Sequence, residues 1–120
     1  MLEIHEQTDL SAYQAQIQAL EADVPVHVAE AIVNGGVGGY ALFSYAPEVV
    51  TLYACEAGED ILLFDGIVRS VFFKAMMRGI GAARFDFEHP WLQTLHFCAP
   101  GESVCPDLEP ILNGCENCHG

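Results

Sequence analysis

Basic residues are the scarcest chemical class in this chain, with 4 lysines and arginines against 17 aspartates and glutamates in 120 residues. The formal net charge is -13 at pH 7. A field of that sign repels the phosphates of nucleic acids and the headgroups of anionic membranes. We therefore expect neither nucleic acid nor a membrane surface among the partners of this protein.

From the sequence we expect neither a secretory leader nor a membrane-spanning segment. The opening residues, Met1 to Glu6, alternate between apolar and charged side chains, and no basic segment precedes an apolar one. Apolar stretches elsewhere are short beside the roughly 20 residues that a membrane-spanning helix needs. We expect a cytoplasmic protein, in which thiols stay reduced and disulfides are rare.

Apolar residues, by contrast, make up 52% of the chain. We expect one domain, and because these residues exceed what one small core uses, we also expect a protein partner, most simply a second copy in a homodimer. The predicted helix over 61–77 has Leu62, Leu63, Phe73 and Met77 beyond its main apolar stripe. These four side chains are the predicted interface.

Periodicity predicts the order β-α-α-β-β-α-β, an α+β domain with a mixed, mainly antiparallel sheet. The predicted strands cover 2–6, 40–45, 49–55 and 82–87, and the predicted helices cover 9–22, 25–34 and 61–77. The helix over 25–34 rests on Pro25 in its first turn and on Asn34-Gly35 as its C-terminal stop. The glycine-rich run 35–39 is interpreted as a flexible connector, and a short helix is expected after Pro90.

The segment from Gly39 to Phe87 resembles the central part of GNAT acetyltransferases. The resemblance rests on the order of the elements and on the run from Arg78 to Phe85, RGIGAARF, which matches a G-I-x-x-A-x-F helix-to-strand pattern of that family. It implies a GNAT-like fold over about half of the chain. No catalytic residue is carried over from the resemblance.

One departure from the family pattern concerns the cofactor. GNAT enzymes bind the pyrophosphate of acetyl-CoA at an Arg/Gln-x-x-Gly-x-Gly/Ala turn before the long helix, where backbone N–H groups face the phosphates. Here the turn from Glu56 to Asp60 reads EAGED, with one glycine and three carboxylates. We therefore expect a GNAT-like fold without acetyl-CoA and without another bound organic cofactor.

Four of the five cysteines, Cys98, Cys105, Cys115 and Cys118, fall in the last 23 residues with the spacing C-x6-C-x9-C-x2-C. Four thiolates near one end of a cytoplasmic chain are typical of a tetrahedral zinc site, and an iron–sulfur cluster uses the same ligands. His119 is an alternative ligand. Residues 115–119 also match the C-x-x-C-H haem-attachment pattern, and Cys115 with Cys118 match a redox pair.

The sequence therefore predicts a GNAT-like domain over 1–97 and a cysteine-rich metal-binding tail over 98–120 that packs on the same domain. We expect a non-catalytic binding or regulatory module. The alternatives are a divergent acyltransferase and a thiol redox or iron–sulfur protein. Histidines and carboxylates just before the tail could serve as acid–base groups or could support a metal ligand, but we favour their interpretation as surface polar residues at the end of a strand. They are Asp86, Glu88, His89 and His96.

Overall fold

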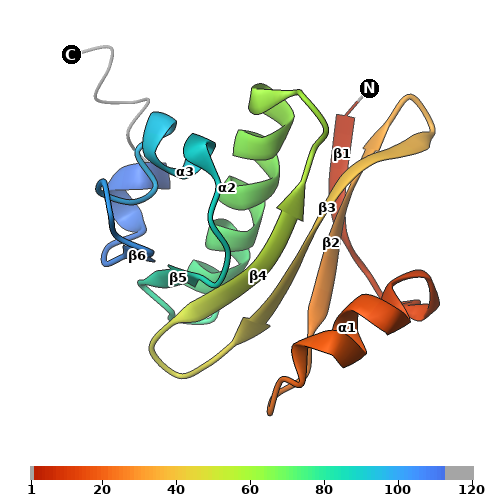
Figure 1. The fold of residues 1–120 in the computed structure, drawn as a ribbon, viewed down its shortest axis with the longest axis horizontal. Coiled ribbons are helices and arrows are strands. Elements are labelled where there is room, and N and C mark those ends of the chain that lie inside the picture. Colours follow the sequence, from red (N-terminus) through yellow and green to blue (C-terminus); the bar gives the residue numbers. More distant parts are fainter. Residues whose placement is uncertain (1, 113–120) are drawn as a thin grey trace.

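The structure, a computed structural model, describes residues 2–112 and forms one six-stranded sheet (Figure 1). The strand order is β1-β2-β3-β4-β5-β6, so each strand lies beside its neighbours in the sequence. Every pairing is antiparallel except the parallel pair β4–β5. This confirms the predicted α+β class with a mixed, mainly antiparallel sheet. The strands are β1 (Leu2–Gln7), β2 (His27–Val33), β3 (Gly36–Tyr45), β4 (Val50–Glu56), β5 (Ala83–Phe85) and β6 (Val104–Cys105).

Helices cover both faces of the sheet. The long helix α2 (Ile61–Met77) makes the crossover between the parallel strands β4 and β5 and packs on one face. The 3-10 turn η1 (Ser11–Tyr13) and helix α1 (Gln14–Leu20) cover the other face over β2 and β3. A short helix, α3 (Pro90–Thr94), follows β5 beside α2. Within residues 2–112 no helix is long and apolar enough to cross a bilayer.

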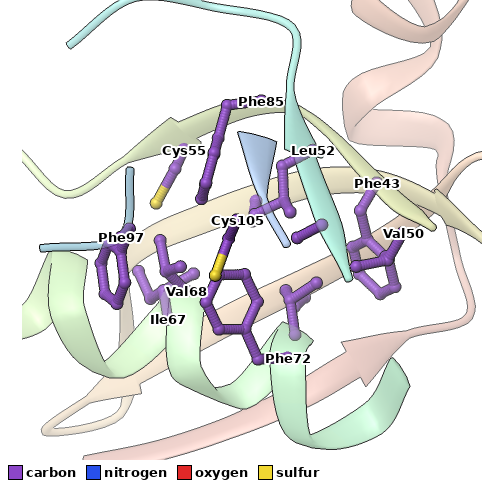
Figure 2. Packing of buried hydrophobic residues seen from close by; sticks show 14 of the residues in the cluster. Phe43, Val50, Leu52, Cys55, Ile67, Val68, Phe72, Phe85, Phe97 and Cys105 are labelled. Carbon is purple, nitrogen blue, oxygen red and sulfur yellow. The ribbon is translucent and has the colours of Figure 1, made fainter. Parts of the chain in front are cut away.

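Helix α2 has the bounds that its apolar period predicts. Its N-cap is Asp60, whose carboxylate accepts the N–H of Leu63 at 3.1 Å. Seven side chains of the helix face the sheet and are buried, namely Leu63, Phe64, Ile67, Val68, Val71, Phe72 and Ala75. Figure 2 shows several of them meeting β-strand residues in the main core. One assignment was wrong: Leu63 belongs to this buried stripe and not to the outer face.

The predicted helix over 25–34 was wrong, because this segment forms β2. Its residues alternate between the two faces of the sheet: Ala29 and Ala31 face the core under α2, whereas Val28 lies in the core under α1. A strand covered on both faces presents a nearly continuous apolar run, which is easily mistaken for a buried helix. Asn34 and Gly35 do not end a helix but form a two-residue hairpin loop with φ of 52° and 85°. Positive φ at both positions is the signature of the hairpin turn that Asn-Gly favours.

The predicted flexible connector over 35–39 was also wrong, because residues 36–39 begin strand β3. Gly39 lies in β3 at the point where this strand contacts both the end of β4 and helix α2. A Cβ atom at Gly39 would lie 2.5 Å from the carbonyl oxygen of Glu56 and 2.8 Å from Cδ1 of Ile67. A glycine is required there because the backbone of β3 approaches β4 and α2 too closely for a side chain.

The remaining boundaries differ by a few residues. The predicted helix over 9–22 divides into η1 and α1, and Asp9 accepts the backbone N–H and the hydroxyl of Ser11 instead of capping α1. The predicted strand over 82–87 shortens to β5. The first part of the predicted tail joins the domain: β6 pairs with β5, and Leu108 is fully buried in the main core. Cys115 and Cys118 lie outside the described residues.

Candidate functional site

The turn between β4 and α2 uses its own carboxylates to satisfy its backbone donors. Glu56 accepts the N–H of Gly58 at 3.1 Å, and Asp60 accepts the N–H of Leu63 at the same distance. The backbone oxygen of Asp60 accepts the N–H of Phe64. A helix N-terminus attracts anions because its first N–H groups lack helical partners. At this terminus Asp60 occupies one such donor, the N–H of Leu63, and Glu56 occupies a donor of the turn that precedes the helix.

Strands β4 and β5 pair in parallel over three residue pairs, from Val50 with Ala83 to Leu52 with Phe85. The pairing of β4 with β3 shifts register directly after Leu52, so that Tyr53 is an extra residue on β4. The last contact is the N–H of Asp86, which donates to the oxygen of Leu52 at 2.8 Å. Beyond this point the chain after β5 leaves β4 and turns toward the start of α2.

An aromatic cluster holds the chain against α2 at this point. The rings of Phe64, His89 and Trp91 lie 4.8 to 5.3 Å apart, centroid to centroid, and Phe64 comes from the first turn of α2. The Nδ1 atom of His89 accepts the N–H of Trp91 at 3.1 Å, as the cap of α3. A neutral His89 ring therefore carries its proton on Nε2, where it is a donor.

A cavity of about 550 Å³ lies next to His89, between the start of α3 and the loop before β6. Its lining is Phe87, Glu88, His89, Pro90, Leu92, Gln93, Gly101, Glu102 and Ser103. Two carboxylates give it an acidic rim, the apolar Leu92 is buried, and His89 and Ser103 supply hydrogen-bonding groups. Small-molecule sites commonly have this size and this mixture of apolar walls and a few polar groups.

The four polar residues noted before the tail separate in the structure. Glu88 and His89 line the cavity, whereas Asp86 and His96 are not among its lining residues. Asp86 is exposed beside the end of β5, and His96 is exposed in a left-handed backbone conformation with φ of 63°. Two of the four residues noted in the sequence therefore line the cavity, and the second carboxylate of its lining, Glu102, comes from a loop that carried no signal in the sequence.

Cys98 and Cys105 are both buried, and both belong to the main core. Burial raises the pKa of Cys98 to about 11, with smaller contributions from Cys105 and Glu102. Burial also raises the pKa of Cys105, although the backbone of Asp107 opposes this effect. Without a bound metal ion, both thiols therefore stay protonated at neutral pH. Such thiols are poor nucleophiles, so neither resembles a reactive redox cysteine.

The first two predicted metal ligands, Cys98 and Cys105, both belong to the main core, and the last two lie outside the described residues. Within residues 2–112 no group of three or more histidine, cysteine or acidic side chains is placed to hold a metal ion. Arg69 connects the cysteine loop with the start of the tail. Its guanidinium carbon lies 5.8 Å from the ring centroid of Phe97, and its Nη1 donates to the oxygen of Ile111.

A second polar cluster, absent from the sequence interpretation, lies at the C-terminal end of α2. The Nδ1 atom of His27 lies 2.8 Å from Oε2 of Glu6, at hydrogen-bond distance. The centroid of the His27 ring lies 4.8 Å from that of the Tyr45 ring. The guanidinium of Arg78 covers the Tyr45 ring at 3.9 Å. Burial, then Glu6, raises the pKa of Tyr45, and Arg78 opposes this. Cross-strand alternation identifies such a cluster only when β2 is recognised as a strand.

Comparison with known proteins places this geometry in a fold class. No family model matches the chain, and no curated protein matches it. Among solved structures, a GNAT-family acetyltransferase from Staphylococcus aureus is similar over 84% of this chain and 82% of its own, with a TM-score of 0.58 and 11% identity. An aminoglycoside 6'-N-acetyltransferase from Enterococcus faecium is similar over 96% of this chain and 82% of its own, with a TM-score of 0.54 and 9% identity.

A third match is a GNAT-family acetyltransferase from Desulfovibrio desulfuricans, with a TM-score of 0.56 and 12% identity over 71% of this chain and 72% of that one. These similarities confirm the GNAT-like fold that the sequence resemblance predicted. At this level of identity they establish the fold alone, so activity has to be argued from the residues of this chain.

Proposed function

We propose that this protein is a binding module on a GNAT-like fold that does not use acyl-CoA. The proposal is carried by the turn before α2, where Glu56 and Asp60 occupy backbone donors and add negative charge. A bound pyrophosphate would have to displace both carboxylates and would still lie beside Glu59. The cavity lined by Glu88, His89 and Glu102 is the site at which a small ligand would bind.

Calorimetric titration with acetyl-CoA tests the first part of this proposal. We expect no binding at millimolar concentrations of ligand. The double variant Glu56→Gln with Asp60→Asn removes both charges and keeps a good N-cap, because asparagine caps helices as well as aspartate does. If charge is the reason, this variant gains weak binding of inorganic pyrophosphate. Low-micromolar binding of acetyl-CoA to the natural chain would contradict the proposal and would favour the divergent acyltransferase.

We further propose that Cys98, Cys105, Cys115 and Cys118 hold one metal centre, zinc first and an iron–sulfur cluster as the alternative. Support comes from the burial of Cys98 and Cys105 in the same core and from the position of Ile111, which Arg69 links to Phe97. Cys115 follows Ile111 by four positions, and an extended chain of that length reaches about 14 Å. The tail is therefore long enough to return to the cysteine loop.

Elemental analysis of protein purified without oxygen tests the metal centre. We expect about one zinc per chain in colourless protein, or iron in brown protein. The variant Cys98→Ser should lose the metal. Cys55→Ser is the matched control, because Cys55 is an equally buried thiol of the core that lies outside the predicted ligand set. Folded, metal-free protein in which the thiols of the tail react freely would contradict the proposal.

A further inference from the structure

The outer face of α2 carries a stripe of large apolar side chains that nothing in the described chain covers. Leu62, Phe73 and Met77 are exposed by 77%, 58% and 74%. With 3.6 residues per turn, positions 62, 66, 73 and 77 lie within about 60° of one another around the helix axis. These four positions are called the α2 stripe below.

Nothing in the described part of a single chain requires a glycine at position 66, in the middle of the α2 stripe. A glycine inside a helix is less stable than an alanine. The backbone of Gly66 does not need positive φ, and an added Cβ would lie 3.7 Å from Cδ1 of Ile4, an ordinary contact. The missing side chain leaves a half-buried notch beside Ile4 of β1, about two turns along the helix from the exposed ring of Phe73.

Charge distinguishes α2 from the rest of the molecule. Its 17 residues contain one acid and two bases, Asp65, Arg69 and Lys74, whereas the whole chain carries a net charge of -13. Asp65 and Arg69 form an ion pair at 2.9 Å, and Arg69 also reaches the oxygen of Ile111. Two copies that approach each other through α2 therefore avoid the acidic surface that would otherwise repel them.

From these observations we propose that α2 is the contact surface of a two-fold dimer, in which it packs antiparallel against α2 of a second copy. The stripe is self-complementary about a point between positions 69 and 70. An axis at that point places Leu62 opposite Met77 of the second copy and the notch at Gly66 opposite its Phe73. A two-fold interface requires the same patch to fit itself in this way. The inference is independent of the ligand of the cavity.

Cysteine cross-linking tests the register of the helices. The antiparallel arrangement predicts that the double variant Leu62→Cys with Met77→Cys forms a covalent dimer under oxidised glutathione, joined between positions 62 and 77. Each single variant should stay at the level of the natural chain, and mass spectrometry of the joined peptides identifies the bond. Equal cross-linking of Leu62→Cys alone would indicate parallel helices and would overturn the proposed geometry.

Sedimentation equilibrium tests whether the stripe holds the dimer. Phe73→Glu should weaken dimerisation by at least about 20-fold, as is typical of a central interface aromatic. Gly66→Leu, which fills the notch, should weaken it as well. Val104→Glu is the matched control, because Val104 is an exposed apolar residue away from α2, and it should change dimerisation by less than about 3-fold. A natural chain that stays monomeric at high protein and salt concentration, or a dimer indifferent to Phe73→Glu, would refute the inference.

Discussion

Replacing glycine by alanine should have opposite effects at two positions of this fold, although the chemical change is the same. At Gly39 the new methyl group would lie 2.5 Å from the backbone oxygen of Glu56, which cannot move without shifting β4. Overpacking of this kind typically lowers the free energy of unfolding by 1–3 kcal/mol, and a clash with backbone lies at the upper end. We expect a loss of about 3 kcal/mol for Gly39→Ala.

Gly66→Ala should instead stabilise the monomer, by about 0.5–1 kcal/mol, because its methyl group meets Ile4 at an ordinary distance and the helix gains propensity. Gly81→Ala is the neutral control, since an added Cβ meets nothing within 4 Å and its φ is not positive. Urea unfolding in dilute solution measures all three variants, with a midpoint shift given by the energy divided by a slope of about 1–3 kcal/mol per molar. Equal effects at Gly39 and Gly66 would refute the steric argument.

Two other perturbations test the interior. Burial raises the pKa of Cys55, a core thiol outside the predicted metal ligands, from its ordinary value of 9.0 to about 12, so the folded state keeps the proton that the unfolded state loses. The corresponding stability is complete below pH 9 and is lost as the pH rises toward 12; urea midpoints from pH 8 to 11 should fall, and Cys55→Ala should flatten the fall by about 1 kcal/mol. Tyr13→Phe should destabilise the protein by about 1–3 kcal/mol, because the hydroxyl of Tyr13 donates to the buried carboxylate of Glu30. Tyr53→Phe, at a half-buried tyrosine, is the control and should change the free energy of unfolding by less than about 0.5 kcal/mol. Equal losses in both variants would show that the hydroxyl of Tyr13 has no special role.

The sequence predicted the parts of the fold that have a strong local signal. Helix α2 was predicted with correct ends because its apolar period continues over 17 residues and Asp60 precedes it. Strand β2 was missed because burial on both faces removed the alternation of apolar and polar residues. The Asn34-Gly35 pair, directly after the β-branched residues Ile32 and Val33, was the signal that could have corrected this assignment.

The candidate site was less accessible to sequence reasoning. Glu88 and His89 were among the four polar residues noted before the tail. Glu102 joins them in the lining of the cavity only when the loop before β6 folds back onto α3. The contact between His27 and Glu6 similarly depends on the register of β1 against β2, in which Glu6 pairs with Ala29. Contacts of this kind are set by tertiary structure, and periodicity in the sequence carries no information about them.

The strand order has a consequence for how the chain assembles. Strands β1 to β4 pair between consecutive antiparallel neighbours, and the β2–β3 pair is closed by a two-residue loop. Strands β5 and β6 join over only three and two residue pairs, after a 17-residue helix has crossed the sheet. Short local loops lower the entropy that must be lost before pairing, so the first four strands and α2 should form a persistent unit. The segment from β5 onward should open first in hydrogen exchange. Because every residue that lines the cavity belongs to that segment, a ligand in the cavity should stabilise the last layer of the fold against opening.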